Sequence, residues 1–107
     1  MENTELPLVT VMIPCYNHEK FIKESIQSVI DQTYSRLELI VIDDGSKDNS
    51  IQIIEEMRLA CEQRFEYFQF VFRENRGLSR TLNQGLSLAR GEYFSIVASD
   101  DIMLPEK

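Results

Sequence analysis

The sequence is poor in several residue types, and each shortage narrows the functions it can have. Its 107 residues include two cysteines, one histidine and no tryptophan. Cys15 and Cys61 have neither zinc-site spacing nor a disulfide framework, and a single histidine excludes a histidine-rich metal centre. We expect reduced thiols in a cytoplasmic protein, with a disulfide possible but not required. The longest aliphatic run, Leu39 to Ile42, is far shorter than the roughly 20 residues of a membrane span.

Positive charge is also scarce. Eleven basic residues stand against 18 acidic ones, which gives a formal net charge of −7. No basic stripe is present to neutralise phosphates, so we expect no nucleic acid as partner and no anionic membrane surface as the main one. Residues 1–5 lack the apolar core of a secretory signal. We expect residues 1–7 to form a flexible tail and residues 8–107 to form one domain.

Strand-like and helix-like patterns alternate along the chain. Residues 9–13, 37–42, 68–73 and 93–98 are β-branched, aromatic or apolar runs that predict four strands. Three stretches between them have apolar residues at helical spacing. The residues of these stripes are Ile22, Ile26, Val29 and Ile30, then Ile53, Met57, Ala60 and Cys61, then Leu78, Leu82, Gly85, Leu86 and Ala89. The pattern predicts an α/β fold with three layers, helices covering both faces of a mainly parallel sheet.

Local signals suggest where these helices begin and end. Asn17 is placed to cap the first helix, and Ser46 or Asp48 is placed to cap the second. Gly91 stands where the third helix should stop, at its C′ position.

Polar clusters follow every predicted strand, at the edge where open parallel sheets bind ligands. Two of these clusters contain adjacent aspartates, Asp43-Asp44 and Asp100-Asp101. Such pairs can hold a divalent cation or accept hydrogen bonds from a base or ribose. The alternative is that they are ordinary turn and cap residues. Neighbouring carboxylates repel one another, and a cation at Asp100 and Asp101 would relieve that repulsion.

Taken together, several segments resemble family 2 glycosyltransferases, which have the GT-A fold. The resemblance covers about residues 7–107. The segments that carry it are Val9–Asn17, Ser25–Tyr34, Glu38–Ser46, Asn75–Ser79, Asn83–Gly85, Ala89–Tyr93 and Ser99–Asp101, with Pro105 just after.

The resemblance implies an inverting transferase that uses a nucleotide sugar, expected to be a UDP-sugar, and a divalent cation, Mn²⁺ or Mg²⁺. It implies a glycan or lipid-linked acceptor and a setting in polysaccharide biosynthesis, with the protein cytoplasmic or peripheral at the cytoplasmic membrane face. By position, Asp100 and Asp101 would bind the metal, which offsets charge on the leaving diphosphate. The expected nucleotide-binding residues are Pro14, Tyr16, Asn17, Glu19, Asp43, Asp44, Arg76, Gly77, Ser99 and Asp100.

Two departures from the family pattern matter. Ala98 stands where the commonest pattern has an aspartate, so ligation would rest on Asp100 and Asp101, with Ser99 as a further candidate. Family members are at least about twice this length, and we expect the acceptor site and the catalytic base to lie outside this donor-binding part. A fragment of this kind would expose a sheet edge and is expected to self-associate.

Two other functions are alternatives to the transferase. One is a nucleotide-binding module without turnover. The other is a nucleotidyltransferase, which would normally have a glycine-rich phosphate loop near the first strand, whereas residues 14–20 contain no glycine.

Overall fold

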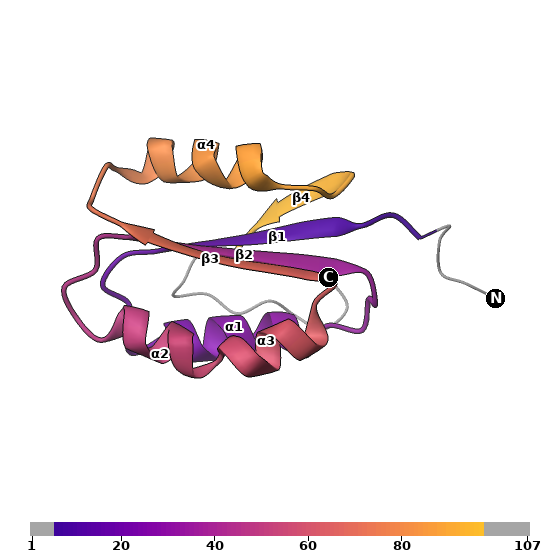
Figure 1. Cartoon of the computed structure of the whole chain (residues 1–107), viewed down its shortest axis with the longest axis horizontal. Coiled ribbons are helices and arrows are strands. Elements are labelled where there is room, and N and C mark those ends of the chain that lie inside the picture. Colours follow the sequence, from indigo (N-terminus) through magenta and orange to yellow (C-terminus); the bar gives the residue numbers. More distant parts are fainter. Residues whose placement is uncertain (1–5, 98–107) are drawn as a thin grey trace.

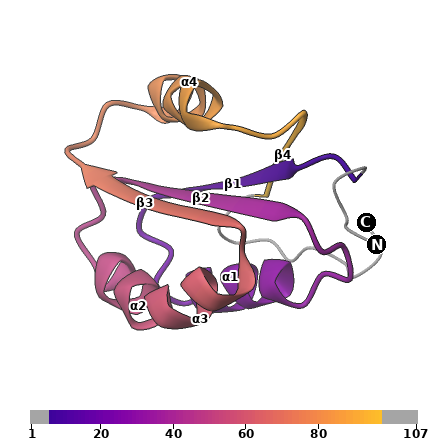
Figure 2. The same ribbon diagram turned by 45° about the vertical axis from the view of Figure 1, so that its right-hand side comes forward.

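The computed structural model describes residues 6–97, which form one twisted sheet between two helical layers. Figures 1 and 2 show α4 on one face of the sheet and α1, α2 and α3 on the other. The strands are β1 (Val9–Cys15), β2 (Leu37–Asp44), β3 (Tyr67–Arg73) and β4 (Tyr93–Ile96). The helices are α1 (Ile22–Ile30), α2 (Ser50–Glu56), α3 (Arg58–Arg64) and α4 (Leu78–Leu88). The expected three-layer α/β architecture is confirmed.

All strand pairs are parallel, and the order in the sheet is β3-β2-β1-β4. The chain moves from β1 outward to β3, then returns and adds β4 on the other side of β1. The order of the strands therefore reverses between β1 and β4, and open sheets of this kind bind ligands in the crevice at that point.

The strand β2 lies at the centre of the packing, and all eight of its residues are buried. Leu39 and Val41 face the larger core, which they share with α1, α2 and α3. Ile40 and Ile42 face the smaller core beneath α4. A strand covered on both faces needs apolar residues in succession, which explains the nearly continuous apolar run in the sequence.

The helix α4 approaches the sheet closely because Gly85 has no side chain. A Cβ at this position would lie 2.4 Å from the sulfur of Met12, which is fully buried in β1. Leu82 and Leu88 of α4 pack on the same small core. A larger residue at position 85 would therefore require either the Met12 side chain or α4 to move.

A buried carboxylate fixes the segment that follows α4. Glu38 is 0% exposed, and its Oε1 accepts hydrogen bonds from the Thr10 hydroxyl at 2.7 Å and the Arg90 N–H at 2.8 Å. Its Oε2 accepts from the Gln69 amide at 3.3 Å. Gly91 donates its N–H to the Thr10 hydroxyl at 2.9 Å. These bonds join β1, β2 and β3 to the chain that leads into β4.

Several of the expected helix boundaries and caps are wrong. The N-cap of α2 is Asn49 and neither Ser46 nor Asp48, although Asp48 accepts the N–H of Ser50 at 2.9 Å. The second predicted helix is two short helices, because α2 ends before Met57 and α3 begins after it. Asn17 is not the cap of α1, which begins at Ile22. Asn17 has a φ of 55° and its side chain accepts the N–H of Lys47 at 2.8 Å instead.

Gly91 is not the C′ residue of α4, whose C-cap is Ala89. A Cβ at Gly91 would lie 2.6 Å from the Thr10 hydroxyl, so close packing explains this glycine.

Candidate functional site

A pocket of about 530 Å³ lies at the carboxyl ends of the strands, on the α4 side of the sheet. Its walls come from the ends of β1, β2 and β4, the loop after β3, and the first turns of α4. The lining residues are Pro14, Cys15, Tyr16, His18, Asp44, Asn75, Gly77, Leu78, Thr81, Leu82 and Ile96. This is the crevice where the order of the strands reverses, so the fold places a pocket where ligands of such sheets bind.

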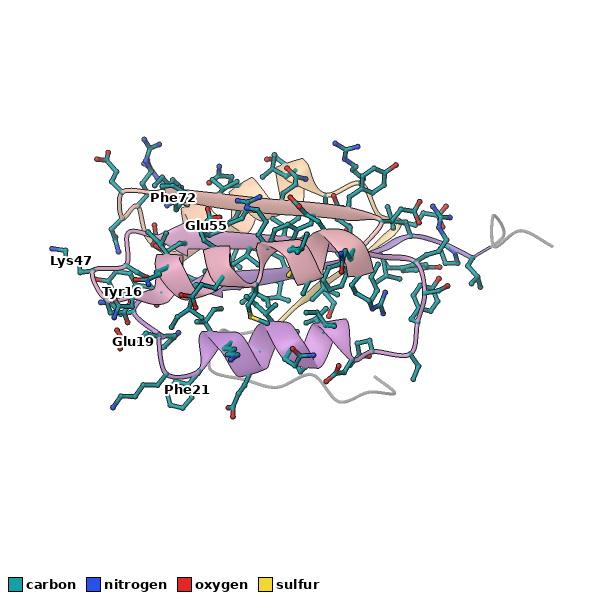
Figure 3. The ribbon with its side chains drawn as sticks, turned by 60° about the horizontal axis from the view of Figure 1, so that its bottom comes forward. Tyr16, Glu19, Phe21, Lys47, Glu55 and Phe72 are labelled. Atoms are coloured by element: carbon teal, nitrogen blue, oxygen red, sulfur yellow. The ribbon has the colours of Figure 1, made fainter. Side chains whose placement is uncertain are left out.

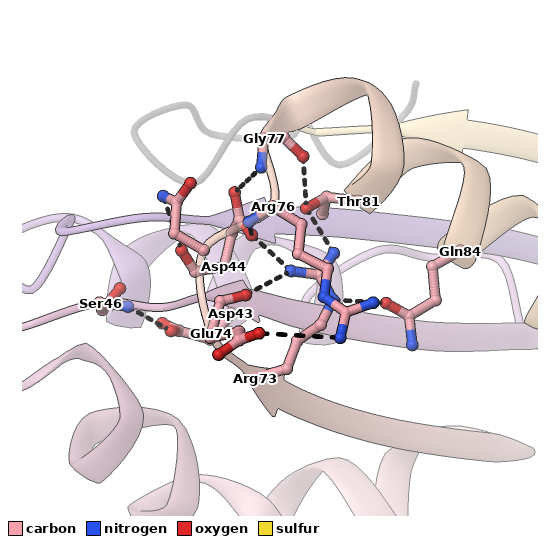
Figure 4. Close-up of polar contacts among 10 residues, drawn as sticks. Asp43, Asp44, Ser46, Arg73, Glu74, Arg76, Gly77, Thr81 and Gln84 are labelled. Atoms are coloured by element: carbon pink, nitrogen blue, oxygen red, sulfur yellow. Dashed lines mark hydrogen bonds and ion pairs between the residues drawn. The ribbon is translucent and has the colours of Figure 1, made fainter.

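Asp44, the last residue of β2, supplies the only carboxylate among the described residues that line this pocket. Its Oδ1 accepts hydrogen bonds from Arg73 Nη1 and from the Arg76 N–H, the latter at 2.8 Å. Its Oδ2 accepts one hydrogen bond, from the Gly77 N–H at 3.1 Å. Figure 4 shows this carboxylate between the arginine and the loop after β3. Since a carboxylate oxygen can accept two hydrogen bonds, Oδ2 retains capacity for a ligand.

The contacts of Asp44 keep it ionised. Burial by itself would raise the pKa of the Asp44 carboxyl. The N–H of Arg76, the guanidinium of Arg73 and the N–H of Gly77 all donate to the carboxylate, and they hold its pKa below the ordinary value of 3.8. At neutral pH, Asp44 is therefore an acceptor, and a ligand that contacts it must present an N–H or O–H.

Two glycines shape the loops around Asp44. Gly45 has a φ of 80°, and a Cβ there would lie 2.6 Å from the backbone nitrogen of Asn75. Gly77, directly before α4, has a φ of 95°. Both conformations favour glycine because other L-residues meet steric strain there. The side chain of Asn75 donates to the backbone carbonyl of Asp44 at 3.1 Å and joins the two loops.

A second polar cluster lies beside the pocket and joins the loop after β1 to the loop after β2. The Glu19 side chain accepts the N–H of Asn49 at 2.9 Å, and Asp48 accepts the N–H of Glu19 at 3.1 Å. Ser46 Oγ accepts the N–H of Asn17 at 2.8 Å. Figure 3 shows Tyr16, Glu19 and Lys47 at this end of the molecule. The cluster fixes the loop that carries Tyr16, which is 43% exposed at the pocket.

Asp43 faces away from the pocket, toward α1, α2 and α3. It pairs in register with Cys15 and is fully buried. Its Oδ1 accepts the N–H of Ser46 at 2.7 Å, while Oδ2 has no hydrogen-bond partner among the described residues. The geometry assigns Asp43 a supporting role in the turn after β2.

The predicted site residues that lie within residues 6–97 thus fall into three groups. Pro14, Tyr16, Asp44 and Gly77 line the pocket. Asn17, Glu19 and Asp43 hold the loops beside it. The side chain of Arg76 lines a separate groove with Arg73, Arg80, Asn83, Gln84 and Ser87, and only its backbone N–H reaches Asp44.

Ser99, Asp100 and Asp101 lie outside the described residues, and so does Ala98. Within residues 6–97, no three acidic, histidine or cysteine side chains are grouped closely enough to hold a metal ion. In the same part of the chain, no helix has the length and apolar character needed to span a membrane.

Sequence reasoning missed several residues of the site. The pocket also contains His18, Asn75 and Thr81 and the apolar side chains of Leu78, Leu82 and Ile96. Sequence reasoning placed Arg73 at the end of the third predicted strand, on the same edge of the sheet, but gave it no role in the site. The position of Arg73 at a strand end was a usable signal, but its pairing with Asp44 was not visible in the sequence.

Comparisons with known proteins agree on one group of enzymes. The sequence model described as "Glycosyl transferase family 2" matches residues 10–107. An uncharacterized glycosyltransferase of Rickettsia typhi is 40% identical over 99% of this chain, and the glycosyltransferase GlyG of Streptococcus pneumoniae is 37% identical over 90% of it. The chain spans 31% of the length of each of these relatives.

Solved structures show the same similarity. A mannosyltransferase from Pyrobaculum calidifontis, in complex with GDP-Man and Mn²⁺, has a TM-score of 0.82 and 29% identity. The match covers 90% of this chain and 28% of that one. The S. aureus TarS 1–349 structure with UDP has a TM-score of 0.80 and 31% identity, with 92% of this chain and 29% of that one covered.

Proposed function

Because the chain belongs to glycosyl transferase family 2, we propose that its pocket binds the nucleoside diphosphate of a nucleotide-sugar donor. The observation that carries this proposal is the Asp44 carboxylate in a pocket with apolar walls at the reversal point of the sheet. A flat base fits between apolar walls, and an ionised acceptor recognises an N–H on its edge. Family membership favours this transferase over the nucleotidyltransferase alternative.

The proposed base is uracil. Uracil presents one N–H, at N3, and Asp44 Oδ2 has capacity to accept it. The complexes of S. aureus TarS with UDP and with UDP-GlcNAc, at 31% and 30% identity, support a uridine donor. Guanine also presents N–H groups on one edge, and the related mannosyltransferase was solved with GDP-Man, so a guanosine donor is the competing case.

We further propose that Asp100 and Asp101 bind a divalent cation, Mn²⁺ or Mg²⁺, which neutralises charge on the leaving diphosphate. They follow Ile96 of β4 by four and five residues, and Ile96 lines the pocket. The related mannosyltransferase contains Mn²⁺, which supports a metal in this group of proteins.

In this proposal residues 8–107 form the donor-binding part of a cytoplasmic, inverting enzyme of polysaccharide biosynthesis. The sugar passes to a glycan or lipid-linked acceptor. No catalytic base is assigned. Within residues 6–97, Asp44 is the only carboxylate that lines the pocket, and its role is in binding.

Calorimetric titration with UDP and GDP, each with and without Mn²⁺, tests the proposal. We expect UDP to bind more tightly than GDP and Mn²⁺ to strengthen the binding. Asp44→Asn replaces one carboxylate oxygen by an N–H₂ group, which cannot accept a hydrogen bond. A hydrogen bond to a charged group contributes about 1.5–3 kcal/mol, so its loss should weaken the binding of UDP by roughly 10- to 150-fold. Glu55→Gln, which changes an exposed acid on α2, is the control. Equal affinity of Asp44→Asn and the wild type for UDP would refute the role of Asp44.

A further inference from the structure

We propose that Arg73 is a positioning residue for the donor. It orients the Asp44 carboxylate so that Oδ2 faces the base. This inference rests on the proposed function, since it concerns the same pocket. Arg73 does not line the pocket itself, and it contacts Asp44 from the neighbouring strand. It would therefore act on a ligand only through Asp44.

Every nitrogen of the Arg73 guanidinium has a partner. Nε donates to the Gln84 side chain at 2.8 Å, and Nη2 donates to the Thr81 hydroxyl at 2.8 Å, so two bonds reach α4. Nη1 donates to Asp44 Oδ1 and to the Glu74 carbonyl, the latter at 3.2 Å. Figure 4 shows the Arg73 side chain between Asp44, Thr81 and Gln84. The Arg73 side chain is 15% exposed and the Asp44 side chain 9% exposed, so little water competes for these bonds.

The contacts make the two oxygens of Asp44 different. Oδ1 has two donors, Arg73 and the Arg76 N–H, which fill its capacity. Oδ2 has one, the Gly77 N–H, and remains able to accept another. Removing Arg73 would leave Oδ1 with one donor, the Arg76 N–H, and would take away the charged side chain that donates to the carboxylate. Two backbone N–H groups alone would then hold the carboxylate, and its orientation toward the ligand would be less strictly fixed.

Only arginine can make this set of bonds. Its planar fork offers donors in three directions at once, whereas lysine offers a single ammonium on a flexible stem. We therefore expect Arg73→Lys to retain part of the effect, because it keeps the charge beside Asp44, and Arg73→Met to retain none. Arg80→Gln is the matched control. Arg80 is exposed on α4, lies in the same groove as Arg73 and is not among the residues that line the pocket.

The test compares the affinities of each variant for UDP and for N3-methyluridine 5′-diphosphate, which lacks the N–H. We expect the wild type and Arg80→Gln to prefer UDP by at least tenfold, Arg73→Lys to prefer it less, and Arg73→Met to lose the preference. If Arg73 had only a general structural role, its replacement would weaken the binding of both ligands equally. The ratio of the two affinities would then stay unchanged. If Arg73→Met binds and keeps the wild-type ratio, the positioning role is refuted while the proposed function stands.

Gln84→Met provides a second variant in case Arg73→Met does not fold. It removes one anchor of the guanidinium and leaves both the charge and Asp44 in place. It should lower the preference for UDP by a few fold, and an unchanged preference in both Gln84→Met and Arg73→Lys would overturn the inference. If the wild type binds neither UDP nor GDP, the proposed function fails, and the positioning role fails with it.

A carboxyl NMR titration of Asp44 without ligand gives an independent readout. The groups that donate to this carboxylate are Arg73 and the N–H groups of Arg76 and Gly77. Cys15, Tyr16 and His18 are the other titratable side chains among the described residues that line this pocket. We expect Arg73→Met to raise the pKa of Asp44, and an unchanged midpoint would contradict the orientation by Arg73.

Discussion

Replacing Thr10 with valine tests whether the buried Glu38 network holds the chain after α4. Valine has nearly the same shape, but it removes a hydroxyl that donates to Glu38 Oε1 at 2.7 Å and accepts the Gly91 N–H at 2.9 Å. The position is 0% exposed, so water cannot replace either bond. Loss of a bond to a charged group and of a neutral bond should lower the free energy of unfolding by about 3 kcal/mol.

Urea denaturation followed by circular dichroism measures this change, and a thermal scan should show a fall in Tm of roughly 10–20 °C. Thr10→Ser is the matched variant, because it keeps the hydroxyl and loses one methyl group, at about 1 kcal/mol. Ser87→Ala removes an exposed hydroxyl that donates to the Gln84 carbonyl, and it should change stability by less than about 0.5 kcal/mol. If Thr10→Val is no more destabilising than Thr10→Ser, the network does not hold this segment.

Three further predictions follow from burial and charge. Because the pKa of Asp44 lies below 3.8, its contribution to stability is present above that pH and is lost as the pH falls through the folded-state pKa. The free energy of unfolding, measured as the pH is lowered, should therefore fall less steeply for Asp44→Asn than for the wild type. Parallel curves of unfolding free energy against pH would contradict this. Burial raises the pKa of Cys61 to about 12, and Cys15 is 1% exposed, so neither thiol should react with a disulfide reagent until urea is added. Rapid reaction of the folded chain would show that the core opens. In the described part of the chain β3 and β4 are both sheet edges, with Tyr93 62% and Ile96 48% exposed on β4, so light scattering should detect species above 12.5 kDa at high concentration. A monomer at every concentration would count against self-association.

The candidate site shows where sequence reasoning stopped. It placed Asp44 and Pro14 at the correct edge of the sheet because each follows an apolar run that reads as a strand. It could not separate the pocket-lining residues from their neighbours. Asn17 and Glu19 have the polar character of ligand-binding residues, yet their side chains accept backbone N–H groups from a loop 30 residues away.

The sequence by itself determined the order of strands and helices, the parallel sheet and the edge where the site lies. These features follow from hydrophobic periodicity and strand ends, which are local properties of the chain. Only the tertiary structure decided which polar groups meet. Arg73 and Asp44 are 29 residues apart, Arg90 and Glu38 are 52 apart, and Gly91 and Thr10 are 81 apart. Hydrogen-bond partners at such separations are set by the register of the strands and by the packing of α4, and both depend on segments that lie far apart in the sequence.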